Sequence, residues 1–194
     1  MEIQLYLKKH KNGRISYGLP LWYRIITLIM LGLIGSSFVV PENSPGVVGW
    51  VVLALLAFSL LYEERWMVDP AKQSIEHRVG IYPVLRRTTI NFSSIAHFSI
   101  DIFARGTVPG SEDEATVKRK GFSILYDKQT ADDSQNALRF FSPKKPYATL
   151  LLVTKDGNTF LVDTQPVRRA ERLLRAGTIL AEACGSILLD REEP

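Results

Sequence analysis

The side chains able to perform acid–base or metal chemistry are spread thinly along this 194-residue chain. The three histidines, His10, His77 and His97, stand far apart, without the close pairing typical of a zinc site or of a nucleophile and its base. The acidic clusters at 112–114 and 132–133 lack the alternating oxygen ligands and closing Glu of a calcium loop. The residues therefore predict no catalytic, cofactor-binding or metal-binding site, and we expect a protein that is not an enzyme.

The single cysteine, Cys184, falls among apolar residues at helical spacing and has no basic neighbour in the sequence. We interpret it as a small core residue rather than a reactive thiol. A lone cysteine also fits a reducing compartment, where a domain needs no disulfide.

Basic side chains supply the remaining candidate sites. The set near the amino end could contact anionic lipid head groups, at about 1 kcal/mol for each basic residue close to such a surface; it comprises Lys8, Lys9, Lys11, Arg14 and Arg24. The set in later polar stretches could bind an acidic patch on a partner protein; it comprises Lys118, Arg119, Lys120, Lys144 and Lys145. Plainer interpretations stay open, namely positive-inside bias for the first set and solvated loop charges for the second.

Two apolar runs, Leu21–Val40 and Gly46–Tyr62, dominate the first third of the chain and are separated by the polar turn PENSP. Their lengths are near the 20 or so residues of a membrane-spanning helix, so they predict a transmembrane helical hairpin. A cleaved export signal is one alternative, but the first run is long for a signal core and is followed at once by another run. Buried helices of a globular domain are the other alternative.

Loop charges predict the orientation of this hairpin. Lys and Arg are frequent before the first run and after the second, whereas the turn between the runs has none. The positive-inside rule then places both termini in the cytoplasm, which in a bacterium means a multi-pass protein of the inner membrane. Gly32, Gly35 and Gly49 offer small faces for association with helices of other membrane proteins.

The rest of the chain shows mainly the two-residue period of β-strands. Seven short runs rich in β-branched and aromatic residues are expected to form an antiparallel sheet; they are 65–69, 74–79, 87–92, 97–103, 121–126, 149–154 and 159–163. The stretches 105–120 and 127–147 are polar and are expected to be long loops, or strands that extend beyond the core. From Pro166 the apolar period becomes helical, with Thr164 as the expected cap.

This plan predicts an α+β protein with three parts. Residues 1–20 form a cytoplasmic arm, 21–62 the hairpin (helices 21–40 and 46–62), and 63–194 one cytoplasmic domain. Seven strands closed by one amphipathic helix are the arrangement of a pleckstrin-homology (PH) barrel. The formal net charge of +4 is too small to indicate nucleic-acid binding.

The segments "RWMVD", "IEHRVG" and "RRTTINFSSIAHFSIDI" after a two-helix hairpin resemble the bacterial PH-like membrane proteins. The layout is also similar to that of the two-helix photosystem I assembly proteins of cyanobacteria and plastids. The resemblance implies a PH-like barrel and brings no catalytic motif. The insert "GSEDEATVKRK" and the polar stretch "DKQTADDSQNALRFFSPKKP" depart from the compact plan, and we expect a specialised partner to bind there.

Two classes of function follow. In the first, the chain is a non-enzymatic scaffold or assembly factor that binds other proteins of a membrane complex. In the second, it senses anionic lipid head groups, with membrane lipid as its ligand. Dispersal of the basic residues favours the first class, because a head-group site gathers them around one loop.

Overall fold

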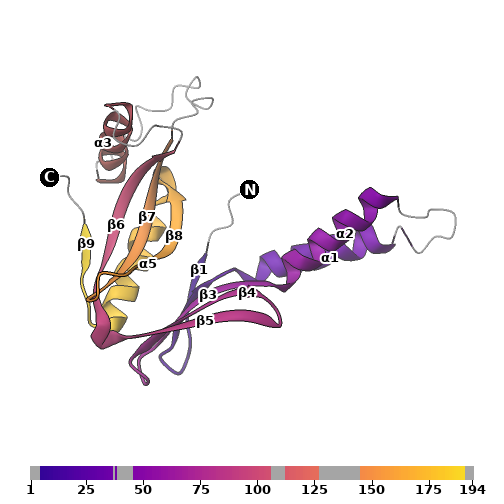
Figure 1. The fold of residues 1–194 in the computed structure, drawn as a ribbon, viewed down its shortest axis with the longest axis horizontal. Helices are drawn as coiled ribbons and strands as arrows, with labels where there is room; N and C mark the ends of the chain where they lie inside the picture. The colour runs from indigo at the N-terminus through magenta and orange to yellow at the C-terminus, as the bar shows by residue number, and fades with distance from the viewer. Residues whose placement is uncertain (1–4, 37, 39–45, 106–111, 127–144, 191–194) are drawn as a thin grey trace. The chain divides into compact units, whose positions relative to one another are not determined.

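The computed structural model describes residues 5–36, 38, 46–105, 112–126 and 145–190. The chain divides into two compact units, residues 1–69 with 75–89 and residues 70–74 with 90–194. Each unit contains one β-sheet (Figure 1). Residues after Tyr62, expected to form one domain, are shared between the two units.

The first unit contains a five-stranded sheet in the order β1-β2-β3-β4-β5. Its strands are β1 (Tyr6–Lys9), β2 (Ile15–Gly18), β3 (Tyr62–Asp69), β4 (Ser74–Ile81) and β5 (Val84–Asn91). β2 pairs antiparallel with both β1 and β3, and all four of its residues are buried. The basic segment at the amino end, expected to be an arm, therefore supplies two strands of this sheet.

Helices α1 (Leu21–Ser36) and α2 (Val47–Leu61) belong to the same unit and lie side by side (Figure 1). α1 ends among Gly35 and Ser36, which are weaker helix formers than the preceding Leu and Ile, and Phe38 N–H donates to Gly35 O in a turn. α2 continues into β3 without an intervening residue.

The transmembrane prediction is wrong, because both helices are too short. α1 has 16 residues and α2 has 15, whereas a spanning helix needs about 20. In the described ranges, no helix is both long and apolar enough to cross a bilayer. This finding contradicts the hairpin of spanning helices at 21–40 and 46–62 and the multi-pass inner-membrane location derived from it. Residues 39–45, which include the PENSP turn, lie outside the described residues.

The second unit contains a four-stranded sheet in the order β8-β7-β6-β9. Its strands are β6 (Ile95–Arg105), β7 (Lys145–Thr154), β8 (Thr159–Pro166) and β9 (Leu188–Asp190). β6, β7 and β8 are antiparallel, with Gly157 at φ +79° in the turn between β7 and β8, and β9 pairs parallel to β6.

The expected PH-like barrel is also wrong, because the strands form two separate sheets. After β5, the short 3-10 helix η1 (Phe92–Ser94) leads into β6, which pairs with β7 and β9. β6 therefore begins a new sheet instead of extending the first one. Six of the seven expected strands are present, and the exception, 121–126, is helical.

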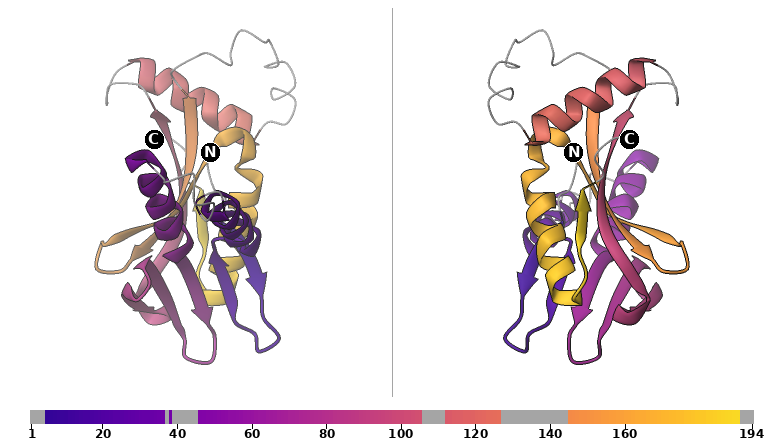
Figure 2. Two further views of the ribbon diagram at one scale, coloured as in Figure 1. Left: turned by 90° about the vertical axis from the view of Figure 1, so that its right-hand side faces the viewer. Right: turned by 90° about the vertical axis from the view of Figure 1, so that its left-hand side faces the viewer.

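Helix α5 (Glu171–Cys184) follows the 3-10 helix η3 (Val167–Arg169) and lies along one face of the second sheet (Figure 2). Its buried face includes Leu173, Gly177, Leu180 and Cys184, at the helical spacing expected from the sequence, whereas Leu174 is only half-buried. Ala170 occupies the cap position without a side-chain bond, while Thr164 lies in β8, so the predicted cap is wrong. Burial raises the pKa of the Cys184 thiol to about 12, which makes it a poor nucleophile at neutral pH.

Helix α3 (Glu112–Tyr126) replaces part of the expected long loop at 105–120 and the expected strand at 121–126. Its Gly121 lies so close to the sheet that a Cβ there would be 2.8 Å from Ile102 Cγ2 and 2.9 Å from Pro146 Cβ. Glycine therefore permits α3 to contact β6 and β7. Of the other expected loop, 127–144 lies outside the described residues and 145–147 begins β7.

Candidate functional site

The paired helices α1 and α2 place hydroxyl groups in the seam between them. Thr27 is 6 % exposed, and its Oγ1 donates to Tyr23 O at 2.9 Å. The hydroxyls of Tyr23 on α1 and Ser59 on α2 are hydrogen-bonded to each other. A helix pair in water ordinarily shows the opposite arrangement, with apolar side chains in the seam and polar ones outside.

The opposite, outward faces of these helices carry large apolar side chains. They are exposed on α1 at Leu21, Trp22, Ile25, Ile26, Leu28, Ile29, Met30 and Leu33, and on α2 at Val47, Val48, Trp50, Val51, Val52, Leu55, Phe58 and Leu61. We call these residues the outer apolar surface. Contiguous exposed apolar area of this extent is typical of a surface that binds something apolar.

The hydroxyl groups of the two helices need no water to complete their hydrogen bonds. Besides Thr27 and the Tyr23–Ser59 pair, Ser36 Oγ donates to Leu33 O at 2.9 Å. An unpaired hydroxyl in apolar surroundings costs several kcal/mol by transfer estimates, roughly 2–7. Internal pairing reduces that cost, so these hydroxyls do not prevent an apolar partner from covering the helices.

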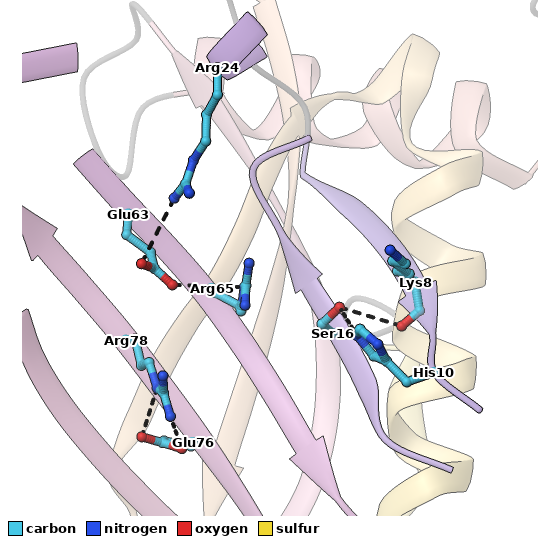
Figure 3. A network of polar contacts seen from close by, with 8 residues as sticks. All are labelled: Lys8, His10, Ser16, Arg24, Glu63, Arg65, Glu76 and Arg78. Carbon is cyan, nitrogen blue, oxygen red and sulfur yellow. Dashed lines mark hydrogen bonds and ion pairs between the residues drawn. The ribbon is translucent and has the colours of Figure 1, made fainter. Parts of the chain in front are cut away.

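Five charged residues form ion pairs near the start of α1 and on β3 and β4. Glu63 lies between two arginines (Figure 3). Its Oε2 is 3.8 Å from Arg24 Nη2, and its Oε1 is 3.9 Å from Arg65 Nε. On β4, Arg78 donates from Nε and Nη2 to Glu76 at 2.8 and 2.9 Å. We call these five residues the charged rim. Partly exposed pairs of this kind contribute little stability, but they mark where the apolar surface ends.

Tyr62, the first residue after α2, is hydrogen-bonded to Glu64, which neighbours the charged rim in sequence. Its hydroxyl donates to Glu64 Oε2 at 3.0 Å. Partial burial, and then the bond to the Glu64 carboxylate, raise the pKa of Tyr62 to about 12. The phenol is therefore a fixed donor and not an acid–base group at neutral pH.

The candidate lipid-facing residues do not form one cluster. Lys8, Lys9 and Lys11 are exposed on β1 and the following turn. Arg14 is engaged elsewhere, with Nη2 2.9 Å from Asp69 Oδ2, and Arg24 is part of the charged rim. Beside the lysines, Ser16 Oγ is bonded to His10 Nε2 at 2.9 Å (Figure 3). Their role in lipid contact stays a prediction.

The candidate partner-binding residues belong to the second unit. Lys118 and Arg119 lie on α3, where Lys118 Nζ is 3.0 Å from Glu114 Oε1, one helical turn away. Lys120 is in the same helix, and Lys145 opens β7, its backbone paired with Arg105. Lys144 lies outside the described residues. On α3, Lys118 is therefore already paired within the chain, whereas Arg119 is exposed.

The glycines of the apolar helices leave room for another molecule. Among the described residues, a Cβ built on Gly32 or on Gly35 meets no atom within 4 Å outside its chain neighbours and the nearby helix backbone. Gly32 and Ser36, one turn apart, are both exposed on α1, which allows close approach of a second helix. Gly49 is half-buried on α2.

Reasoning from the sequence missed the polar seam. The sequence does indicate it, because Tyr23 and Thr27 are four residues apart and therefore share one side of a helix. Polar residues on the side of an apolar helix that faces a neighbouring helix reverse the usual amphipathic pattern.

Across the ranges that the structure describes, no three His, Cys, Asp or Glu side chains are grouped closely enough to hold a metal ion. His77 stacks on Trp66 in the first sheet, while His10 bonds to Ser16. The candidate functional site among the described residues is therefore the outer apolar surface. Comparison with protein-family models and with curated proteins finds no match for this chain.

Proposed function

We propose that this protein is a non-enzymatic accessory or assembly subunit that binds other proteins, and that the outer apolar surface is where it binds them. The observation that carries the proposal is the inverted polarity of α1 and α2. The hydroxyls of Tyr23, Thr27 and Ser59 lie in the seam and are hydrogen-bonded there, while Leu, Ile, Val, Trp and Phe face outward. Covering such a surface is favourable, by about 25 cal/mol for each Å² of apolar area removed from water.

A partner that presents apolar helices fits this surface well. On α1 the exposed side chains of Ile29 and Leu33 are near Gly32 in the sequence, and Gly32 itself adds no side chain to this surface. Helices pack by placing the ridges of one into the grooves of the other. The charged rim then forms the polar border that surrounds the apolar centre of a typical protein interface.

Association with lipid is the second candidate, favoured by a different observation. Apolar residues cover the outward sides of both helices, and the exposed Lys8, Lys9 and Lys11 belong to the same unit. An apolar helix surface accompanied by lysines is typical of proteins that bind anionic lipid surfaces.

Substitution on the outer apolar surface tests the first candidate. Ile29→Gln with Leu55→Gln changes two residues that are 54 % and 63 % exposed, so the fold should be retained. Co-purification from the native cells in mild detergent, quantified by mass spectrometry, should show at least a tenfold loss of partner protein. The matched control is Leu161→Gln with Ile187→Gln, which are 58 % and 61 % exposed in the second unit and should leave recovery unchanged.

Vesicle flotation separates the two candidates. The purified full chain is mixed with vesicles of neutral lipid alone or with added anionic lipid. Lipid binding would be favoured if the protein floats tightly with the vesicles and the Ile29→Gln, Leu55→Gln variant does not. If the co-purification also yields no protein partner, the first candidate is rejected.

A further inference from the structure

Three aromatic residues and one carboxylate form a row on one face of the first sheet. Tyr62, Glu64 and Trp66 stand two residues apart on β3, and side chains two residues apart on a strand share a face. His77 belongs to the neighbouring strand β4 and stacks on Trp66, with ring centroids 4.0 Å apart. Glu64 is therefore placed between Tyr62 on one side and the Trp66–His77 stack on the other.

Glu64 is hydrogen-bonded to the first of these neighbours, since the Tyr62 hydroxyl donates to its Oε2 at 3.0 Å. His77 Nε2 is buried and has no hydrogen-bond partner among the described residues. Glu64 lies two residues along β3 from the residue on which His77 stacks, and such diagonal neighbours on adjacent strands are within reach of long side chains. Rotation of the Glu64 side chain therefore suffices to bring its carboxylate to His77.

Glu64 is the charged group that acts on His77 in the described part of the chain. Burial lowers the pKa of His77, and the Glu64 carboxylate opposes that shift. The other charged residues of β3 and β4 alternate with Glu64 and His77 and so point to the opposite face, while those of β5, the other neighbour of β4, are exposed. They are Glu63, Arg65 and Asp69 on β3, Glu76 and Arg78 on β4, and Arg86 and Arg87 on β5.

Protonation makes His77 a stronger partner for Glu64 than Tyr62 is. The imidazolium carries its charge against Trp66, which is 2 % exposed, and a charge in such surroundings is costly unless it is paired. A neutral phenol leaves the charge of the carboxylate in place, whereas the imidazolium compensates it. Tyr62 is half-buried, so its hydroxyl can donate to water once the carboxylate has turned.

We propose that Glu64 is shared between Tyr62 and His77, and that uptake of a proton by His77 moves the carboxylate from the first to the second. The exchange takes place at the junction of α2 and β3, because Tyr62 directly follows α2 and its backbone N–H donates to Phe58 O in the last turn of that helix. Acid therefore frees the side chain of the residue that joins this helix to the sheet. The inference concerns β3 and β4 and does not rest on the function proposed above.

Titration of His77 by nuclear magnetic resonance in the full chain, in mild detergent, tests the exchange. The ring signal of His77 is the one that is lost in His77→Phe. Because coupling between two sites is reciprocal, a bond of Tyr62 that protonation of His77 breaks must itself oppose that protonation. Tyr62→Phe should therefore raise the pKa of His77, by about 0.5–1 pH unit for a bond of ordinary strength. Glu64→Gln, which removes the counter-charge, should lower that pKa.

The matched control is Tyr82→Phe, the same change at a tyrosine of the first unit that is 64 % exposed, and it should leave the pKa of His77 at the parent value. A second readout is the Cζ signal of Tyr62 in isotope-labelled protein, which should shift with the His77 titration in the parent and lose that shift in Glu64→Gln. Circular dichroism at each pH checks that the variants remain folded. An unchanged or lower pKa of His77 in Tyr62→Phe, an equal rise in Tyr82→Phe, an unchanged pKa in Glu64→Gln, or a Tyr62 signal that does not follow His77 overturns the exchange.

Discussion

The imidazole of His77 stacks on the indole of Trp66, with ring centroids 4.0 Å apart and planes 11° from parallel. Trp66 is 2 % exposed, and neither Trp66 Nε1 nor His77 Nε2 has a hydrogen-bond partner within the described residues. Burial lowers the pKa of His77, and the nearby Glu64 carboxylate opposes that shift only in part. The first sheet therefore holds His77 in its neutral form.

This stacking predicts a pH-dependent stability. Because the pKa of His77 is lower in the folded protein, the unfolded chain, with a His pKa of about 6.5, takes up the proton first as pH falls. The contribution of His77 is therefore fully present above about pH 7.5 and is lost as pH falls through 6.5 toward the folded pKa. Chemical unfolding at a series of pH values measures this change in the free energy of unfolding. It is followed by Trp66 fluorescence in a Trp22→Phe, Trp50→Phe background.

The variant His77→Phe is the matched control, because it keeps an aromatic ring on Trp66 and does not titrate. The free energy of unfolding of the parent should fall relative to that of His77→Phe between about pH 7.5 and 5.5. A constant difference across this range would show that His77 has the same pKa in the folded and unfolded chains.

Packing of α5 on the second sheet gives a second prediction. Leu173 is fully buried on the inward face of α5, so Leu173→Ala should lower the free energy of unfolding by about 2–5 kcal/mol. Arg175, on the same helix, pairs with Glu171 at 3.7 Å in an exposed position, and Arg175→Ala should cost less than about 1 kcal/mol. Thermal unfolding by circular dichroism compares the two. Similar losses would rule out this packing of α5.

The Gly80 turn gives a third prediction. Gly80→Ala should lower the free energy of unfolding more than Gly157→Ala does. Both glycines have positive φ, but only the Cβ at position 80 would meet an atom, Val84 O at 2.5 Å, while the one at 157 meets nothing within 4 Å. Backbone strain alone costs about 1–3 kcal/mol. Equal effects in urea unfolding would show that the β4–β5 turn relaxes freely.

Local patterns predicted most of the secondary structure. Period-two alternation located β3 to β8, and helical spacing located the buried face of α5, because both patterns record which side of an element is buried. The strand predicted at 121–126 failed because a short apolar run can belong to a helix as well as a strand. β1 and β2 were missed because their charged and turn-forming neighbours resemble a solvated arm.

The arrangement of the elements could not be predicted in the same way. Pairing of β2 with β3 joins Ile15 to Val68 across more than fifty residues of sequence, and no local pattern encodes that partner. The same limit explains the wrong barrel, since whether β6 pairs with β5 or with β9 depends on the whole sheet. For α1 and α2, hydropathy indicated apolar helices but overestimated their lengths, and the Tyr23–Ser59 pair across the seam is a tertiary contact.

The protein mass of the native assembly tests the central claim most directly. The full chain is purified from its native cells in mild detergent, and light scattering with a correction for bound detergent and lipid gives the mass of protein alone. The account predicts more protein than the 21.9 kDa of one chain, with the excess due to a different protein, and a fall to 21.9 kDa for the Ile29→Gln, Leu55→Gln variant. A wild-type mass of 21.9 kDa, or a whole multiple made of this chain alone, would contradict it.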